Sequence, residues 1–190
     1  MAAARAGFAD VRVIMGVRRQ DQYLASRYAQ HGKLADEPGQ ADFERQTLEI
    51  IDPAKRYFID GVWLDYKTTR DLIVNVLGVD GVLILPLEQL GADRSGYFAA
   101  LGRFLGEAIA PDDEAEHREN VRSVAPDVWR CTMGSRRFGR LFAIVGLSAR
   151  REIEIRLGPE VKSKILAAYE DSNRRLAADI GIDLARYGYC

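Results

Sequence analysis

Residues 11–30 place a strand pattern directly before a helix pattern, and this junction constrains the fold more than any other part of the chain. The stretch reads VRVIMGVRRQDQYLASRYAQ. Its first seven residues are mostly β-branched or apolar, which is typical of a buried strand. From Arg19 onward, apolar and aromatic residues recur every three to five positions, which predicts a helix packed on a sheet. Strands that lead almost directly into helices build open α/β folds, so we predict a parallel β-sheet flanked by helices.

The end of the first strand is also where we expect a ligand, because open α/β sheets bind ligands at the carboxyl ends of their strands. Arg18 and Arg19 lie there, and Ser26 follows Arg18 by eight residues, about two helical turns. A helix N-terminus offers unpaired N–H groups, and arginine offers a planar fork that fits phosphate oxygens. The pattern indicates an anion site. The alternative is an arginine on the surface or in an ion pair.

The segment RRQDQYLASRY resembles the 3′-phosphate-binding segment of the sulfotransferase family, in which a strand leads to an arginine and a serine follows eight residues later. Residues 82–106 resemble a later strand, acidic turn and helix of that family. Residues 169–189 are similar to the C-terminal tail of bacterial members that act on carbohydrates. The three segments occur in the family's order over nearly the whole chain.

The resemblance implies a nucleotide-kinase-like sulfotransferase fold in a single domain over residues 1–190. It implies that Arg18 and Ser26 bind the 3′-phosphate of the co-substrate PAPS (3′-phosphoadenylyl sulfate). The implied enzyme transfers a sulfuryl group from PAPS to a hydroxyl of a carbohydrate or polysaccharide, without a metal. Neither the resemblance nor the residues identify a catalytic base.

The chain departs from the family at its start. Members carry an earlier strand and a basic loop for the 5′-phosphosulfate, whereas residues 1–10 contain no glycine-rich basic loop. The similar letters Lys67-Thr68-Thr69 are predicted to begin a helix, with Thr68 or Thr69 as its N-cap. We therefore interpret the chain as N-terminally truncated. The alternative functions are a non-catalytic homologue that serves as a nucleotide-binding or interaction module, and an unrelated nucleotide-binding α/β protein.

Composition narrows the expected partners and compartment. The net charge of −1 argues against nucleic-acid binding, which needs a strongly basic face. Cys131 and Cys190 support neither a disulfide framework nor a zinc site, which favours a reducing, cytoplasmic location. No segment approaches the roughly 18 apolar residues of a membrane span. We expect a nucleotide sulfate donor and a carbohydrate acceptor as partners, and the possibility of a homo-oligomer stays open.

The rest of the chain alternates predicted helices with one further strand. The helices are predicted over residues 41–52, 64–77, 93–105 and 160–180, with glycine C-caps at Gly78 and Gly181, and the strand over residues 82–87. Glu88, at the end of that strand, is assigned to capping or pairing and not to catalysis. Residues 31–40 and the acidic residues 107–119 are predicted as loops.

Three groups of residues were weighed for the site. His31 is interpreted as a solvated residue at a helix C-terminus rather than a catalytic base. Residues 55–57 and Trp63 lie where related sulfotransferases form the acceptor cleft, and packing or surface positions are the alternative. Residues 130–156 hold seven arginines and no lysine, which favours a charged helix surface or the wall of an anionic pocket. The residues in these last two groups are Lys55, Arg56, Tyr57, Trp63, Arg136, Arg137, Arg140, Arg150 and Arg151.

Overall fold

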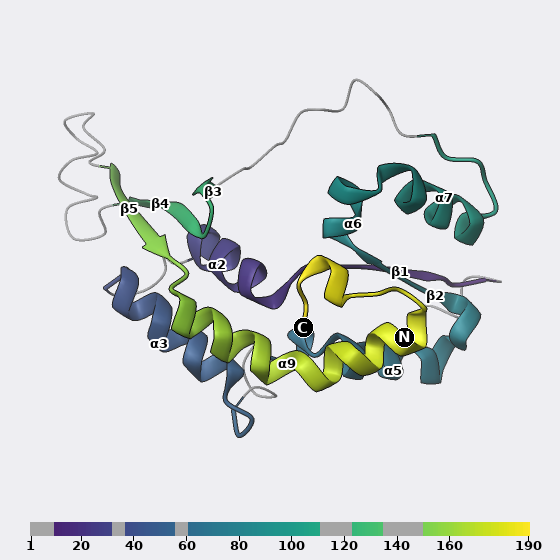
Figure 1. Cartoon of the computed structure of the whole chain (residues 1–190), viewed down its shortest axis with the longest axis horizontal. Coiled ribbons are helices and arrows are strands. Elements are labelled where there is room, and N and C mark those ends of the chain that lie inside the picture. Colours follow the sequence, from purple (N-terminus) through teal and green to yellow (C-terminus); the bar gives the residue numbers. More distant parts are fainter. Residues whose placement is uncertain (1–9, 32–36, 56–60, 111–122, 135–149) are drawn as a thin grey trace.

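Figure 1 shows the computed structural model of the chain, which describes residues 10–31, 37–55, 61–110, 123–134 and 150–190. The described residues form a mixed α/β structure with a parallel pair of strands, β1–β2, and an antiparallel sheet in the order β3–β4–β5. Several predicted segments lie outside the described residues: residues 1–9, most of the acidic stretch, Arg56, Tyr57, Arg136, Arg137 and Arg140.

The parallel pair consists of β1 (Val13–Val17) and β2 (Val82–Pro86). The strands pair in register, so that Val17 lies opposite Pro86 and the two carboxyl ends are adjacent. The prediction of an α/β structure with parallel pairing is confirmed at this level. Because the two ends meet, whatever follows each strand is brought to one edge.

Helix α2 (Gln20–His31) begins two residues after β1, as the sequence pattern predicts. The structure also contains two short helices that were not predicted as separate elements, α4 (Gly61–Leu64) and α6 (Leu87–Ala92). The remaining helices lie within a few residues of their predicted ranges: α3 (Gln40–Ile51), α5 (Tyr66–Leu77), α7 (Arg94–Leu105) and α9 (Pro159–Ile180). Short 3₁₀ turns η2 (Val79–Gly81) and η3 (Ala185–Tyr187) follow α5 and α9.

Both predicted glycine C-caps are confirmed. Gly78 has a φ of 81° and its N–H donates to the Val74 carbonyl at 2.8 Å. Gly181 has a φ of 67° and its N–H donates to the Ala177 carbonyl at 3.0 Å. Positive φ values favour glycine because it has no Cβ, so these two residues end their helices.

The predicted N-cap of α5 is wrong, although the predicted helix start is confirmed. The cap is Asp65, whose carboxylate accepts a hydrogen bond from the Thr68 N–H at 3.1 Å. The Ser172 hydroxyl of α9 donates to the same oxygen at 2.5 Å. An aspartate immediately before the helix satisfies its first N–H groups, so no threonine hydroxyl is needed for that purpose.

The arginine-rich stretch forms strands where the structure describes it, so its interpretation as a charged helix is wrong. Strands β3 (Ser123–Ala125), β4 (Val128–Gly134) and β5 (Arg150–Arg156) pair antiparallel. The sequence alternates with a period of two, which is the strand period. Trp129, Cys131 and Ile155 are buried, while Arg130 lies 3.5 Å from Glu152 and 3.7 Å from Glu154 on the exposed side.

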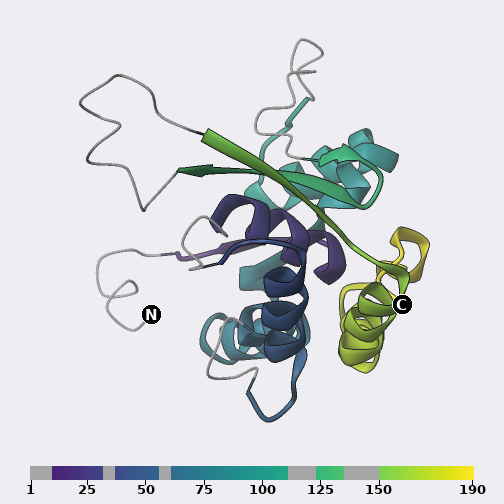
Figure 2. The same cartoon turned by 90° about the vertical axis from the view of Figure 1, so that its left-hand side faces the viewer.

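The core lies where α2 packs between this sheet and the helices α3 and α9. Figures 1 and 2 show α2 in this central position, and Figure 1 shows α9 running alongside α3 and α5. The buried stripe of α9 includes Ile165, Tyr169 and Leu176, each fully buried. Leu184 and Tyr189, beyond α9, are also fully buried. Burying a leucine stabilises a fold by about 1.5–3 kcal/mol, so the tail after α9 is part of the core.

Among the helices that the structure describes, none combines the length and the apolar character that crossing a bilayer requires. Cys131 is buried and Cys190 is exposed, and neither forms a disulfide.

Candidate functional site

A pocket of about 470 Å³ lies at the carboxyl end of β1. Its walls come from the end of β1, one face of α2, the junction of α4 with α5, and the start of α6. Arg18 and Ser26, the two residues predicted to bind an anion, both line it. The structure therefore brings together two side chains that lie eight residues apart.

Arg18 lines this pocket. Its side chain is half-buried and makes no hydrogen bond or ion pair with any other residue in the described part of the chain. Its backbone carbonyl accepts a hydrogen bond from the Tyr66 hydroxyl at 2.7 Å. The backbone of Arg18 is thus fixed, while its positive charge is available to a ligand.

The neighbouring Arg19 is engaged within the protein. Its guanidinium contacts both carboxylate oxygens of Asp21, at 3.1 Å and 2.5 Å, and Asp21 is fully buried. Two parallel N–H to oxygen bonds are the geometry in which arginine pairs best with a carboxylate. Of the two arginines that follow β1, Arg19 is therefore the one held in an ion pair.

The exposed face of α2 lines the pocket through Tyr23, Ser26, Arg27 and Gln30. The last three follow Tyr23 by three, four and seven residues. This spacing places them on one side of a helix. The opposite side, with Leu24 and Tyr28 among its residues, is buried in the core. Tyr23, one of the recurring aromatic residues of the predicted helix, is 37% exposed and belongs to the pocket wall rather than to the packed face.

Aromatic side chains form the wall across from α2. Trp63 is 64% exposed and Tyr66 is buried, and both line the pocket. Burial raises the pKa of the Tyr66 hydroxyl, so this group stays protonated and donates to Arg18 near neutral pH. Lys55, the other described residue weighed for an acceptor cleft, is exposed and is not part of this lining.

The lining carries basic groups and no acidic residue among the described side chains that form it. Besides the two arginines it includes His31, the last residue of α2. His31 is exposed, as expected for a helix C-terminus, and it faces the same pocket. The protein as a whole has a net charge of −1, so the basic character is local.

Glu88 holds the backbone at the edge of the site. One carboxylate oxygen accepts from the Arg19 N–H at 2.9 Å, and the other accepts from the Tyr189 hydroxyl at 2.7 Å. Glu88 therefore accepts hydrogen bonds from the backbone and from a tyrosine, and its exclusion from catalysis stays a prediction. Lys67 lies elsewhere, in ion pairs with Asp71 and Asp179.

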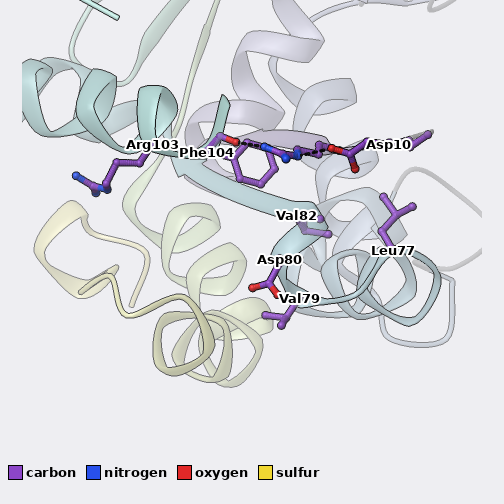
Figure 3. A pocket seen from close by; sticks show the side chains of 10 residues that line it. Asp10, Leu77, Val79, Asp80, Val82, Arg103 and Phe104 are labelled. Carbon is purple, nitrogen blue, oxygen red and sulfur yellow. Dashed lines mark hydrogen bonds and ion pairs between the residues drawn. The ribbon is translucent and has the colours of Figure 1, made fainter. Parts of the chain in front are cut away.

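A second pocket, of about 590 Å³, lies at the opposite ends of β1 and β2 (Figure 3). Its central arginine, Arg12, is already engaged: it donates to Asp10 at 2.9 Å and to the Phe104 carbonyl at 2.6 Å. Ligands of α/β sheets bind at the carboxyl ends of strands, which is where the Arg18 pocket lies and the second pocket does not. We therefore assign the site to the Arg18 pocket.

Sequence reasoning named Trp63 for an acceptor cleft, but it missed Tyr66 and the contacts from Tyr189. No spacing in the sequence connects residues 63–66 or the C-terminal tail with Arg18; only the tertiary packing does. In the described part of the chain, no cluster of three or more His, Cys, Asp or Glu residues is arranged to hold a metal ion. No protein-family model, curated protein or solved structure matches this chain.

Proposed function

We propose that the Arg18 pocket binds the 3′-phosphate of the adenosine 3′,5′-bisphosphate part of PAPS. The protein would then take part in the transfer of a sulfuryl group from PAPS to a carbohydrate hydroxyl. The observation that carries the proposal is that one basic pocket is lined by a serine and by an arginine with no partner among the described residues. Arginine and a hydroxyl together supply charge-assisted and neutral hydrogen bonds to one phosphate group.

The size and the walls of the pocket support a nucleotide. Its volume of about 470 Å³ lies in the range of small-molecule sites. The exposed ring of Trp63 offers a flat apolar surface beside the cationic groups. A nucleoside phosphate carries a flat base and an anion, so both parts of the pocket have a counterpart in such a ligand.

In this proposal the pocket contributes affinity rather than rate. A 3′-phosphate is remote from the transferred sulfuryl group, so its contacts stabilise the bound donor and the transition state about equally. Binding is therefore the first property to test.

The test is isothermal titration calorimetry of the chain with adenosine 3′,5′-bisphosphate and with adenosine 5′-phosphate. The proposal expects tighter binding of the bisphosphate, and equal affinities would contradict it. A radiolabelled-PAPS assay over a panel of polysaccharides then separates the two forms of the proposal. Sulfate transfer would mark an enzyme, and binding without transfer would mark a non-catalytic module.

A further inference from the structure

We propose that Tyr189 and Glu88 are positioning residues that orient Arg18 toward its ligand, so that the C-terminal tail controls the affinity of the pocket. This inference rests on the proposed function for its ligand. The contacts themselves are present in the protein without a ligand and do not depend on the proposed function.

The peptide group between Arg18 and Arg19 is held by side chains on both of its polar sides. Its carbonyl oxygen accepts from the Tyr66 hydroxyl at 2.7 Å, and its N–H donates to the Glu88 carboxylate at 2.9 Å. This peptide lies between the end of β1 and the start of α2, outside either ladder of backbone hydrogen bonds. Two side chains from other elements therefore determine the orientation of its plane.

The fixed peptide holds the backbone from which the Arg18 side chain extends. It limits ψ of Arg18 and φ of Arg19, and adjacent side chains leave an extended chain in opposite directions. In the structure Arg19 turns to Asp21, while Arg18 lines the pocket. A shift of this peptide would move the backbone of Arg18 and with it the origin of the side chain that enters the pocket.

Tyr189 in turn fixes Glu88. Its hydroxyl donates to the carboxylate oxygen that Arg19 does not use, at 2.7 Å. The ring of Tyr189 is fully buried, and its own carbonyl accepts from the Asn173 side chain of α9 at 2.8 Å. A carboxylate held at both oxygens has one orientation, whereas one held at a single oxygen can rotate. The Tyr189 hydroxyl is therefore the first member of a series of hydrogen bonds that runs through Glu88 to the peptide group between Arg18 and Arg19.

The attachment of α9 to α2 keeps this arrangement in place. Asn173 also exchanges two hydrogen bonds with Gln20, at 2.8 Å and 3.1 Å, and both residues are fully buried. Gln20 is the first residue of α2, so the start of that helix and the tail share one anchor. Loss of the Tyr189 hydroxyl alone would leave this anchor intact, which makes a specific test possible.

The test compares Tyr189→Phe with Tyr187→Phe. Tyr187 lies two residues away in the same tail, and its hydroxyl makes no hydrogen bond with the described residues, so it is a matched control. Hydrogen exchange of the Arg19 amide is measured by NMR, and the dissociation constant for adenosine 3′,5′-bisphosphate by calorimetry. For Tyr189→Phe we expect exchange about tenfold faster and binding about three- to tenfold weaker. Tyr187→Phe should change neither.

Glu88→Gln provides a second variant if Tyr189→Phe is poorly folded. Glutamine keeps one carbonyl oxygen as acceptor, so its effect should lie between those of the wild type and Glu88→Ala. Unchanged Arg19 exchange in Tyr189→Phe would overturn the proposed fixation of the peptide. Faster exchange with unchanged affinity would overturn the effect on Arg18. Failure of the wild type to prefer the bisphosphate would instead overturn the proposed function, and Arg19 exchange would still decide whether the tail fixes the peptide.

Discussion

Arg18 and Arg19 are adjacent in the chain, yet Arg18 lines a pocket while the Arg19 guanidinium forms a two-bond ion pair with the fully buried Asp21. The difference in their surroundings predicts a difference in what each contributes. Arg18 should contribute to ligand affinity, and Arg19 to the stability of the fold.

Arg18→Ala should weaken binding of adenosine 3′,5′-bisphosphate by about 1.5–3 kcal/mol, roughly ten- to a hundredfold, because a charge-assisted hydrogen bond is lost. Its unfolding free energy should change little. Arg19→Ala should lower the unfolding free energy by about 1–3 kcal/mol, because it leaves the buried Asp21 without its partner. Calorimetry and urea unfolding of both variants measure the two effects. A larger loss of affinity for Arg19→Ala than for Arg18→Ala would contradict this assignment.

Gly16 lies in the floor of the pocket, near the end of β1. An added Cβ there would meet only Leu87, at 3.8 Å, which is an ordinary contact. Gly16→Ala should therefore stabilise the strand by about 0.5–1 kcal/mol while it narrows the pocket. Gly16→Val should reduce ligand affinity further than alanine does. Thermal unfolding and calorimetry test this pair, and unchanged affinity in both variants would show that the ligand does not approach this strand.

Trp63 is 64% exposed, so its removal should cost little stability. If its ring stacks on the base of the ligand, Trp63→Ala should weaken nucleotide binding by about 1–3 kcal/mol. Leu72→Ala is the matched control, because Leu72 is 59% exposed on α5 and lies outside the pocket lining. Equal affinities for the two variants would remove Trp63 from the site.

Three tyrosines should make the protein less stable in alkaline solution. Burial raises the pKa of Tyr28, Tyr66 and Tyr189, and hydrogen bonds to Asp42 and Glu88 raise those of Tyr28 and Tyr189 further. In the unfolded chain these hydroxyls ionise near pH 10, whereas in the folded protein they stay protonated. The stability they contribute is fully present below about pH 10 and is lost as the pH rises above it.

Urea unfolding between about pH 8 and pH 11, with absorbance at 295 nm as a second measurement, tests this dependence. Tyr189→Phe should make the loss of stability above about pH 10 less steep, because one of the three groups no longer titrates. An equal slope in the variant and the wild type would show that Tyr189 ionises at its ordinary pH.

The sequence predicted those features that depend on local spacing. The strand before Arg18, the helices, and the C-caps at Gly78 and Gly181 all follow from neighbouring residues. The helix and its preceding strand also place Arg18 and Ser26 at the same edge, because both lie within one short segment.

Features that depend on distant segments could not be predicted in this way. The antiparallel sheet was missed because charged residues alternate with Trp129, Cys131 and Ile155, and the density of arginines hid a period of two. Tyr66 was missed because it reaches the pocket only through tertiary packing, in which α5 lies against α9.

The buried pair of Gln20 and Asn173 joins residues 153 positions apart, and it has a consequence for how the protein is made. Residues 18–26 are synthesised before residues 66, 88 and 173, which hold them by hydrogen bonds, and before Tyr189, which holds Glu88. Contacts of such long sequence separation form late, because the chain between them must first be ordered. A nascent chain that has not yet reached Tyr189 therefore carries Arg18 and Ser26 without the contacts that fix the edge of their pocket.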